Sequence, residues 1–114
     1  MGFSEHERKR IEATLRPYCA RKSPAHLRDR LRVGFRLEGL SAVLFESRPL
    51  FNDPSRWVEI VVAKFRFTKS TGTWRLYWAD RNSRWHRFEG AVESRTLDPL
   101  LRVVDKDPTG IFWG

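Results

Sequence analysis

The chain has 114 residues, of which 40% are hydrophobic and 32% charged, and its formal net charge is +8. This is the size of one domain, and fifteen aromatic residues among the 114 exclude a disordered chain. The lone Cys19 excludes an internal disulfide, and no stretch approaches the roughly 20 apolar residues of a membrane helix. We therefore expect a cytoplasmic protein with no membrane segment.

The positive charge is unevenly placed along the chain. Residues 1–88 contain 19 of the 22 basic residues and 9 of the 14 acidic ones, whereas residues 89–114 contain 3 and 5. Such a distribution favours a polyanionic partner such as nucleic acid. Arginine accounts for 17 of the 22 basic residues, and codon usage alone can also produce an Arg-rich chain.

The first segment, residues 4–31, is predicted to be helical. Ser4 and Glu7 have the spacing of a capping box that opens a helix. Apolar residues then recur at helical spacing: Ile11, Leu15, Tyr18 and Cys19. Pro17 is expected to kink this helix or end its regular part.

A second, short helix is predicted before the strands begin. Ser23 and Pro24 fit its N-cap and first helical position, with Leu27 and Leu31 turned inward.

From residue 32 the apolar pattern changes from helical to alternating, which predicts a β-meander over residues 32–89. Turn-forming residues at 38–41, 70–72 and 80–83, and a longer loop at 48–55, separate five extended stretches. Strands joined by such short turns pair antiparallel. The sequence therefore predicts a five-stranded antiparallel sheet.

The last segment, residues 96–114, is predicted to be a short helix followed by a tail. Thr96 is the expected N-cap, Pro99 fits the first turn, and the apolar positions are Leu97, Leu100, Leu101 and Val104. After a turn at 107–110, the apolar residues 111–113 either fold back on the core or protrude as a partner-binding motif, and we favour the first. Helices before and after the strands indicate an α+β fold with all helices on one face of the sheet.

Alternation along the strands assigns the residues to two faces. The core face is predicted to hold Val33, Phe35, Leu37, Phe65, Phe67, Trp74, Leu76, Trp78 and Trp85. The opposite face then holds Arg32, Arg36, Lys64, Arg66, Arg75, Tyr77, Arg84 and His86. Glu46 and Arg48 share a face, and Glu46 is the one acid that the pattern places among these cations.

A cationic sheet face of this kind favours a binding module for nucleic acid, with RNA or a single strand preferred. Arginine and lysine would contact phosphates, and Tyr77 offers a ring on which a base can stack. The predicted binding residues are Arg36, Arg48, Lys64, Arg66, Arg75, Tyr77, Arg84 and His86. No helix-turn-helix or RNP-type motif accompanies them.

Two other functions stay open at this point. The same face could bind an acidic protein or a second copy of the chain. A nuclease-like hydrolase would need converging oxygen ligands, and Glu59 lies on the wrong face for Lys64 unless a β-bulge intervenes. Glu46, Asp53 and His86 form a loose alternative set for acid–base work.

No resident cofactor or metal is predicted. The spacings of the cysteine and histidines match no zinc pattern, and no nucleotide-binding motif occurs. Whether the chain is an enzyme stays open.

Several stretches together resemble a family of small bacterial proteins catalogued only as a domain of unknown function. The resemblance covers nearly the whole chain and rests on RPYCARKSPAH at 16–26, LRVGFRLEG at 31–39, VLFESRPLF at 43–51, VAKFRF at 62–67, WRLYWADRNSRWHRF at 74–88 and DPTGIFWG at 107–114. It implies a bacterial, cytosolic protein and brings no catalytic residue to carry over.

Overall fold

The computed structural model describes residues 2–91 and 93–113. Its first element is an 18-residue helix, α1 (Glu5–Lys22). The predicted capping box is present: the Ser4 N–H donates to Glu7 Oε1 at 2.8 Å, and the Glu7 N–H donates to Ser4 Oγ at 3.2 Å. The helix does not end at Pro17 but continues to Lys22. Pro17 and Ala13 are both exposed, so water can satisfy the carbonyl that the proline leaves without a donor.

The predicted cap at Ser23 is wrong, because this side chain has a different role. Ser23 is buried, and its hydroxyl accepts the Val33 N–H at 2.7 Å, which joins the end of α1 to the first strand. The short helix that follows is one 3-10 turn, η1 (Ala25–Leu27), with Pro24 as its N-cap. Leu27 and Leu31 are half-buried.

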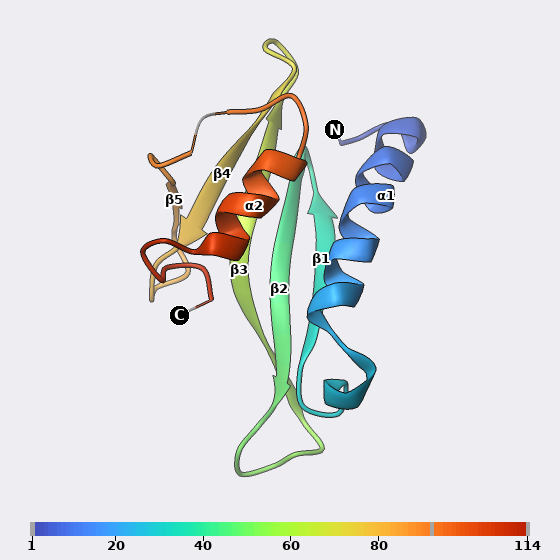
Figure 1. Cartoon of the computed structure of the whole chain (residues 1–114), viewed down its shortest axis with the longest axis vertical. Coiled ribbons are helices and arrows are strands. Elements are labelled where there is room, and N and C mark those ends of the chain that lie inside the picture. Colours follow the sequence, from blue (N-terminus) through green and yellow to red (C-terminus); the bar gives the residue numbers. More distant parts are fainter. Residues whose placement is uncertain (1, 92, 114) are drawn as a thin grey trace.

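The five predicted strands form one antiparallel sheet in the order β1-β2-β3-β4-β5 (Figure 1). Their bounds are β1 (Arg32–Glu38), β2 (Ser41–Pro49), β3 (Trp57–Thr68), β4 (Thr73–Ala79) and β5 (Trp85–Arg87). Each strand pairs with the next along the chain, as the short turns predict. The meander and the α+β fold are confirmed.

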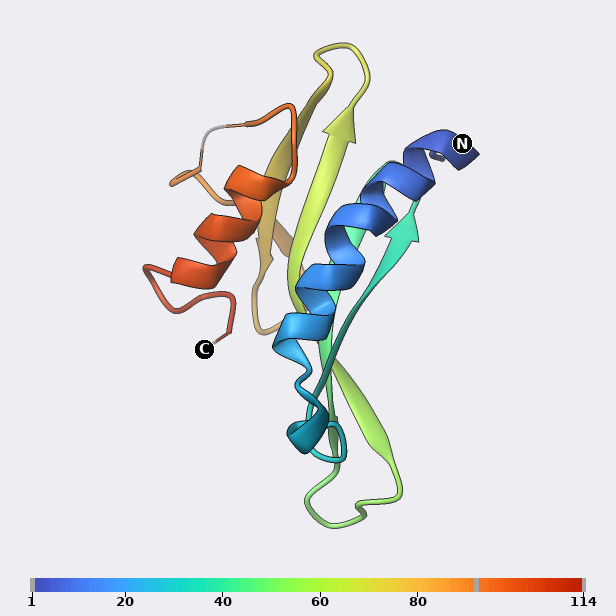
Figure 2. The same ribbon diagram turned by 45° about the vertical axis from the view of Figure 1, so that its right-hand side comes forward.

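The C-terminal helix α2 (Asp98–Lys106) lies with α1 on one side of the sheet (Figures 1 and 2). Its N-cap is Leu97, without a side-chain cap, so the prediction for Thr96 is wrong, whereas Pro99 does occupy the first turn. The core lies between these helices and the sheet, around fully buried side chains such as Leu15, Phe65 and Leu100. No helix in the described ranges is long and apolar enough to cross a membrane.

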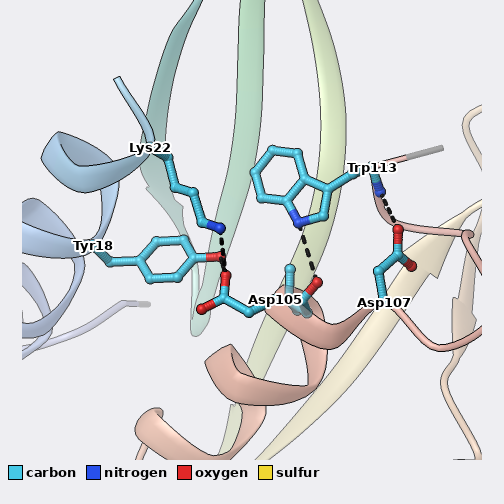
Figure 3. A network of polar contacts seen from close by, with 6 residues as sticks. Tyr18, Lys22, Asp105, Asp107 and Trp113 are labelled. Carbon is cyan, nitrogen blue, oxygen red and sulfur yellow. Dashed lines mark hydrogen bonds and ion pairs between the residues drawn. The ribbon is translucent and has the colours of Figure 1, made fainter. Parts of the chain in front are cut away.

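The tail after α2 folds back on the molecule, and polar contacts fasten it there (Figure 3). The two carboxylate oxygens of Asp107 accept the backbone N–H groups of Phe112 and Trp113 at 3.0 and 2.9 Å. The indole N–H of Trp113 donates to the Val104 carbonyl at 3.1 Å, and Phe112 is buried in the core. Of the two alternatives for residues 111–113, the structure shows the tail folded back on the core.

A second group of contacts joins the end of α1 to the end of α2 (Figure 3). The Tyr18 hydroxyl donates to Asp105 Oδ1 at 2.7 Å, and Lys22 Nζ lies 2.8 Å from the same oxygen. Burial of Tyr18, together with this hydrogen bond, raises the pKa of its hydroxyl above the ordinary value. The two helices are thereby held at one point by a buried hydroxyl.

Candidate nucleic-acid interface

The sheet face turned away from both helices is here called the open face. The strand register places these side chains on it: Arg32, Arg36, Val43, Phe45, Trp57, Glu59, Lys64, Arg66, Arg75, Tyr77, Trp85 and Arg87. Val43 is buried although it lies outside the core cluster between sheet and helices. Its own neighbours on the open face therefore cover it.

A β-bulge in the β2–β3 pairing changes which residues reach the open face. The register shifts between Leu44 and Phe45, because β3 carries one extra residue opposite this point. Beyond the shift Glu59 pairs with Ser47, on the same face as Lys64. The β-bulge that would bring Glu59 to the face of Lys64 is therefore present, and Glu59 adds an acidic side chain to the open face.

Arg36 lies at the centre of a small cluster on the open face. It contacts Glu38 on its own strand and Glu59 two strands away, the second at 2.6 Å. The hydrogen bonds that the Arg36 guanidinium donates to both carboxylates raise its pKa, and the guanidinium is also 5.4 Å from the centre of the Phe45 ring. The Phe45 ring in turn lies against Gly34, where an added Cβ would approach its Cζ to 3.0 Å.

Two more cations on the open face lie over aromatic rings. The guanidinium carbon of Arg32 is 4.1 Å from the centre of the Trp57 ring, and Lys64 Nζ is 5.6 Å from that of Trp85. Both tryptophans are half-exposed. Each of these pairs combines a positive charge with a flat ring, the two groups that bind a phosphate and stack on a base.

The β4 side of the open face carries the remaining predicted residues. Lys64 lies opposite Tyr77, and Arg66 lies opposite Arg75. Arg75 pairs with Glu93 at 2.7 Å, which raises the pKa of Arg75 and lowers that of Glu93. Within residues 2–91 and 93–113, neither Lys64 nor Arg66 has a carboxylate within ion-pair distance.

The faces predicted for Trp85 and His86 are wrong, because the β4–β5 loop is one residue longer than the predicted turn. Ala79 pairs with Trp85, and Trp78 pairs with His86, so the loop spans 80–84. A shift of one residue turns every side chain of a strand to the other face. Trp85 and Arg87 therefore lie on the open face, whereas His86 stacks on Trp78 at 4.7 Å on the helix side.

Asp80 holds this longer loop together. Its carboxylate accepts the N–H groups of Asn82 and Arg84 at 2.8 and 3.0 Å and lies 2.7 Å from His86 Nε2. Ser83 has a left-handed backbone with φ of 61°. Arg84 is part of the loop and exposed, so it lies outside the paired strands that form the open face.

The loop should therefore lose its structure in acid. The hydrogen bond from His86, followed by those from the backbone, lowers the pKa of Asp80 to about 2 from 3.8. A carboxylate whose pKa falls on folding stabilises the fold above its unfolded pKa, and this contribution disappears as the pH falls through the folded pKa. We expect the amide resonances of residues 80–86 to shift between about pH 4 and 2. Asp80→Asn should move that transition out of this range, and an unchanged transition would contradict the role of Asp80.

Arg48 lies on the helix side of the sheet rather than the open face. Ala42, Leu44, Glu46 and Arg48 alternate along that side of β2, and Arg48 Nε is 3.4 Å from Glu46. The prediction that these two share a face is confirmed, but the face itself was wrongly assigned. β2 begins apolar on both sides, so the pattern did not reveal which side was the core.

The alternative acid–base residues are spread over the fold. Glu46 is near the end of β2, Asp53 bonds Ser55 in the β2–β3 loop, and His86 is in β5. In the described ranges no group of three or more His, Cys, Asp or Glu side chains could hold a metal ion.

The helix side of the sheet also has a cleft. It has a volume of about 310 Å³ and lies between α1, the β3–β4 hairpin and the start of α2. Its lining includes the rings of Phe3, Phe67 and Trp74 and the side chains of Arg10 and Arg95. The sequence pattern did not predict it, because its walls come from three distant segments.

Comparison with known proteins identifies a family but no activity. The sequence matches the family described as "Domain of unknown function (DUF3024)" over residues 3–114. No curated protein and no solved structure matches the chain.

Proposed function

Since the chain belongs to the DUF3024 family, whose description assigns no activity, we propose a function from the surface itself: the open face binds single-stranded nucleic acid, with RNA preferred. The observation that carries this proposal is the alternation of half-exposed rings and cations over the whole face. Four rings contribute, those of Phe45, Trp57, Tyr77 and Trp85.

The charge of the open face supports an anionic ligand. The open face has six cations, Arg32, Arg36, Lys64, Arg66, Arg75 and Arg87. They exceed Glu59 on the same face and the two further acids that pair with its arginines, Glu38 and Glu93, which leaves a net charge of +3. The acids hold Arg36 and Arg75 in fixed positions without cancelling the field. Lys64 lies opposite Tyr77 and over the Trp85 ring, and Arg66 is two residues further along the same face of β3. These two cations are the best placed to contact phosphates.

The shape of the face favours a single strand over a duplex. Stacking on a side chain needs a base that is not already stacked within a helix, and single strands provide such bases. A broad sheet cannot enter a groove as one helix or a two-stranded ribbon does. RNA is preferred in the proposal because the neighbouring glutamates and Tyr77 can bond a 2′-hydroxyl.

The proposal is tested by the anisotropy of a labelled 15-nucleotide oligouridylate titrated with the protein at two salt concentrations. With four phosphates neutralised, the affinity should fall about 20-fold between 50 and 150 mM salt. Oligothymidylate should bind more weakly than oligouridylate. Absence of binding at 50 mM salt would refute the proposal, and equally tight binding of polyglutamate would indicate a general polyanion site that includes acidic proteins.

The ring of Trp85 should contribute by stacking. Alanine substitution at a stacked ring costs about 1–3 kcal/mol of binding, so we expect Trp85→Ala to weaken oligouridylate binding at least fivefold. The intrinsic fluorescence of the wild type should also fall on binding. Phe51→Ala removes a fully exposed ring on the β2–β3 loop and is the matched control, with unchanged affinity expected. Equal losses in both variants would contradict a specific role for Trp85.

A further inference from the structure

The three exposed large hydrophobic side chains of the described residues all lie on one hairpin. They are Phe51 in the β2–β3 loop and Val58 and Ile60 in the first half of β3, with 38% of Val58 and 47% of Ile60 exposed. This end of the hairpin extends beyond both helices (Figure 1). Scattered exposed apolar residues are ordinary, but a gathering of all of them in one place indicates a contact surface.

The backbone in the same place has an open edge. β3 has twelve residues, and β4 pairs only with residues 64–68 of it. In the described structure, residues 57–61 therefore pair with β2 on one side and with no strand on the other, and Val62 is the extra residue of the bulge. Every second residue of such an edge presents a backbone donor and acceptor that another strand can meet.

The two outer edges of this sheet carry the usual protection against strand addition, and the half-edge of β3 does not. β1 has charged residues at 32, 36 and 38 and a glycine at 34, and β5 is only three residues long. The segment 57–62 reads WVEIVV, with no proline or lysine and with strong strand formers throughout. An unprotected edge beside exposed apolar side chains has the features of a strand-pairing interface.

We propose that a second copy of this chain pairs with this edge, the two β3 segments running antiparallel about a two-fold axis. Pairing centred on Ile60 places Ile60 opposite its own copy, so the two exposed Ile60 side chains cover each other, and it places Val58 opposite Val62, which is already buried in the fold. Glu59 then faces Val61 rather than itself, and its carboxylate is already paired with Arg36. This inference is independent of nucleic-acid binding.

Charge favours a copy of the chain over an acidic partner at this edge. Glu59 is the one charged side chain between Trp57 and Ala63, so no cation within the segment can select an acidic strand. The segment instead matches a neutral, apolar strand, which is what the same segment of a second copy offers. In the paired arrangement the two open faces lie side by side in one continuous sheet.

The dimer should be weak and reversible. A pairing of about six residues buries much less than the roughly 1,600 Å² of a standard interface. We therefore expect a dissociation constant in the range of tens to hundreds of micromolar. Sedimentation equilibrium between 5 µM and 1 mM should show the mass rise from 13.5 kDa towards twice that value.

The test compares this mass with that of charge variants at the edge. Ile60→Lys and Val58→Lys should each remain monomeric at 1 mM, since the first brings two lysines together at the two-fold axis and the second places a charged lysine against the apolar Val62 of the second copy. Both positions are exposed, and circular dichroism and melting temperature verify that the variants fold. Ser70→Lys, which adds the same charge at the exposed β3–β4 turn, is the control and should dimerise like the wild type.

Amide hydrogen exchange identifies the surface independently of the substitutions. Exchange over residues 57–62 should slow as the protein concentration rises, while exchange in β5 stays unchanged. A wild type that remains monomeric at 1 mM would overturn the proposal. A dimer that survives both lysine variants, or one that protects another segment, would overturn it equally.

Discussion

Reversal of Lys64 and Arg66 to glutamate is expected to weaken the binding of single-stranded RNA about 100-fold at 50 mM salt. Each substitution removes a phosphate contact and replaces it with a repulsive charge, and the salt dependence should become correspondingly shallower. Both side chains project from the open face, and no carboxylate of the described residues is within ion-pair distance of either. The fold should tolerate the change. The measurement is the anisotropy titration with labelled oligouridylate.

A control variant with the same net charge distinguishes the loss of contacts on the open face from the effect of the protein's overall charge. Arg102→Glu with Lys106→Glu makes the same change in charge on exposed positions of α2, on the helix side. If the open face is the site, this control should lose no more than a few fold through long-range attraction. Similar losses in the two double variants would show that only net charge matters, and that the open face is not a site.

The second large effect concerns stability. Asp105→Ala is expected to lower the free energy of unfolding by about 2 kcal/mol, because it leaves the buried Tyr18 hydroxyl without its acceptor. Tyr18 is 1% exposed, and Asp105 is the hydrogen-bond acceptor that its hydroxyl has among the described residues. Tyr18→Phe should cost less, about 1 kcal/mol, because Asp105 keeps its contact with Lys22. Urea unfolding followed by circular dichroism gives both values.

The double variant distinguishes this explanation from simple loss of contacts. Asp105→Ala combined with Tyr18→Phe should be more stable than Asp105→Ala alone, since no buried hydroxyl is left without a partner. Additive losses would contradict it.

The pH dependence of stability gives a further check on the Tyr18 hydroxyl. Burial, and then the bond to Asp105, raise the pKa of Tyr18 above 10.0. The stabilisation that comes from burying the neutral Tyr18 hydroxyl is therefore fully present below pH 10 and declines as the pH rises further.

Most of the fold could be predicted from the sequence because local signals agreed with one another. The capping box at Ser4, the change of period at residue 32 and the short turns each indicated one element. The elements that were misassigned lacked such agreement. Serine is a common N-cap residue, but the Ser23 hydroxyl accepts a hydrogen bond from the backbone N–H of Val33. Such a contact between residues ten positions apart leaves no local sequence pattern.

The candidate site was harder to predict because it depends on register. A loop one residue longer than expected moved Trp85 to the open face and His86 away from it. The bulge in β3 brought Glu59 beside Arg36, which no periodicity could show. The central residues Lys64, Arg66, Arg75 and Tyr77 were assigned to the correct face, since apolar side chains alternate with side chains that carry a polar group over residues 64–68 and 73–78.

The most direct test of the open face as a nucleic-acid interface is amide chemical-shift mapping of the protein during titration with oligouridylate at 50 mM salt. Our account predicts that the largest changes fall on β3 and β4 around Lys64, Arg66 and Tyr77, and on the indole N–H of Trp85. Changes confined to the helix-side cleft around Phe3, Arg10 and Trp74, or no changes at all, would contradict it.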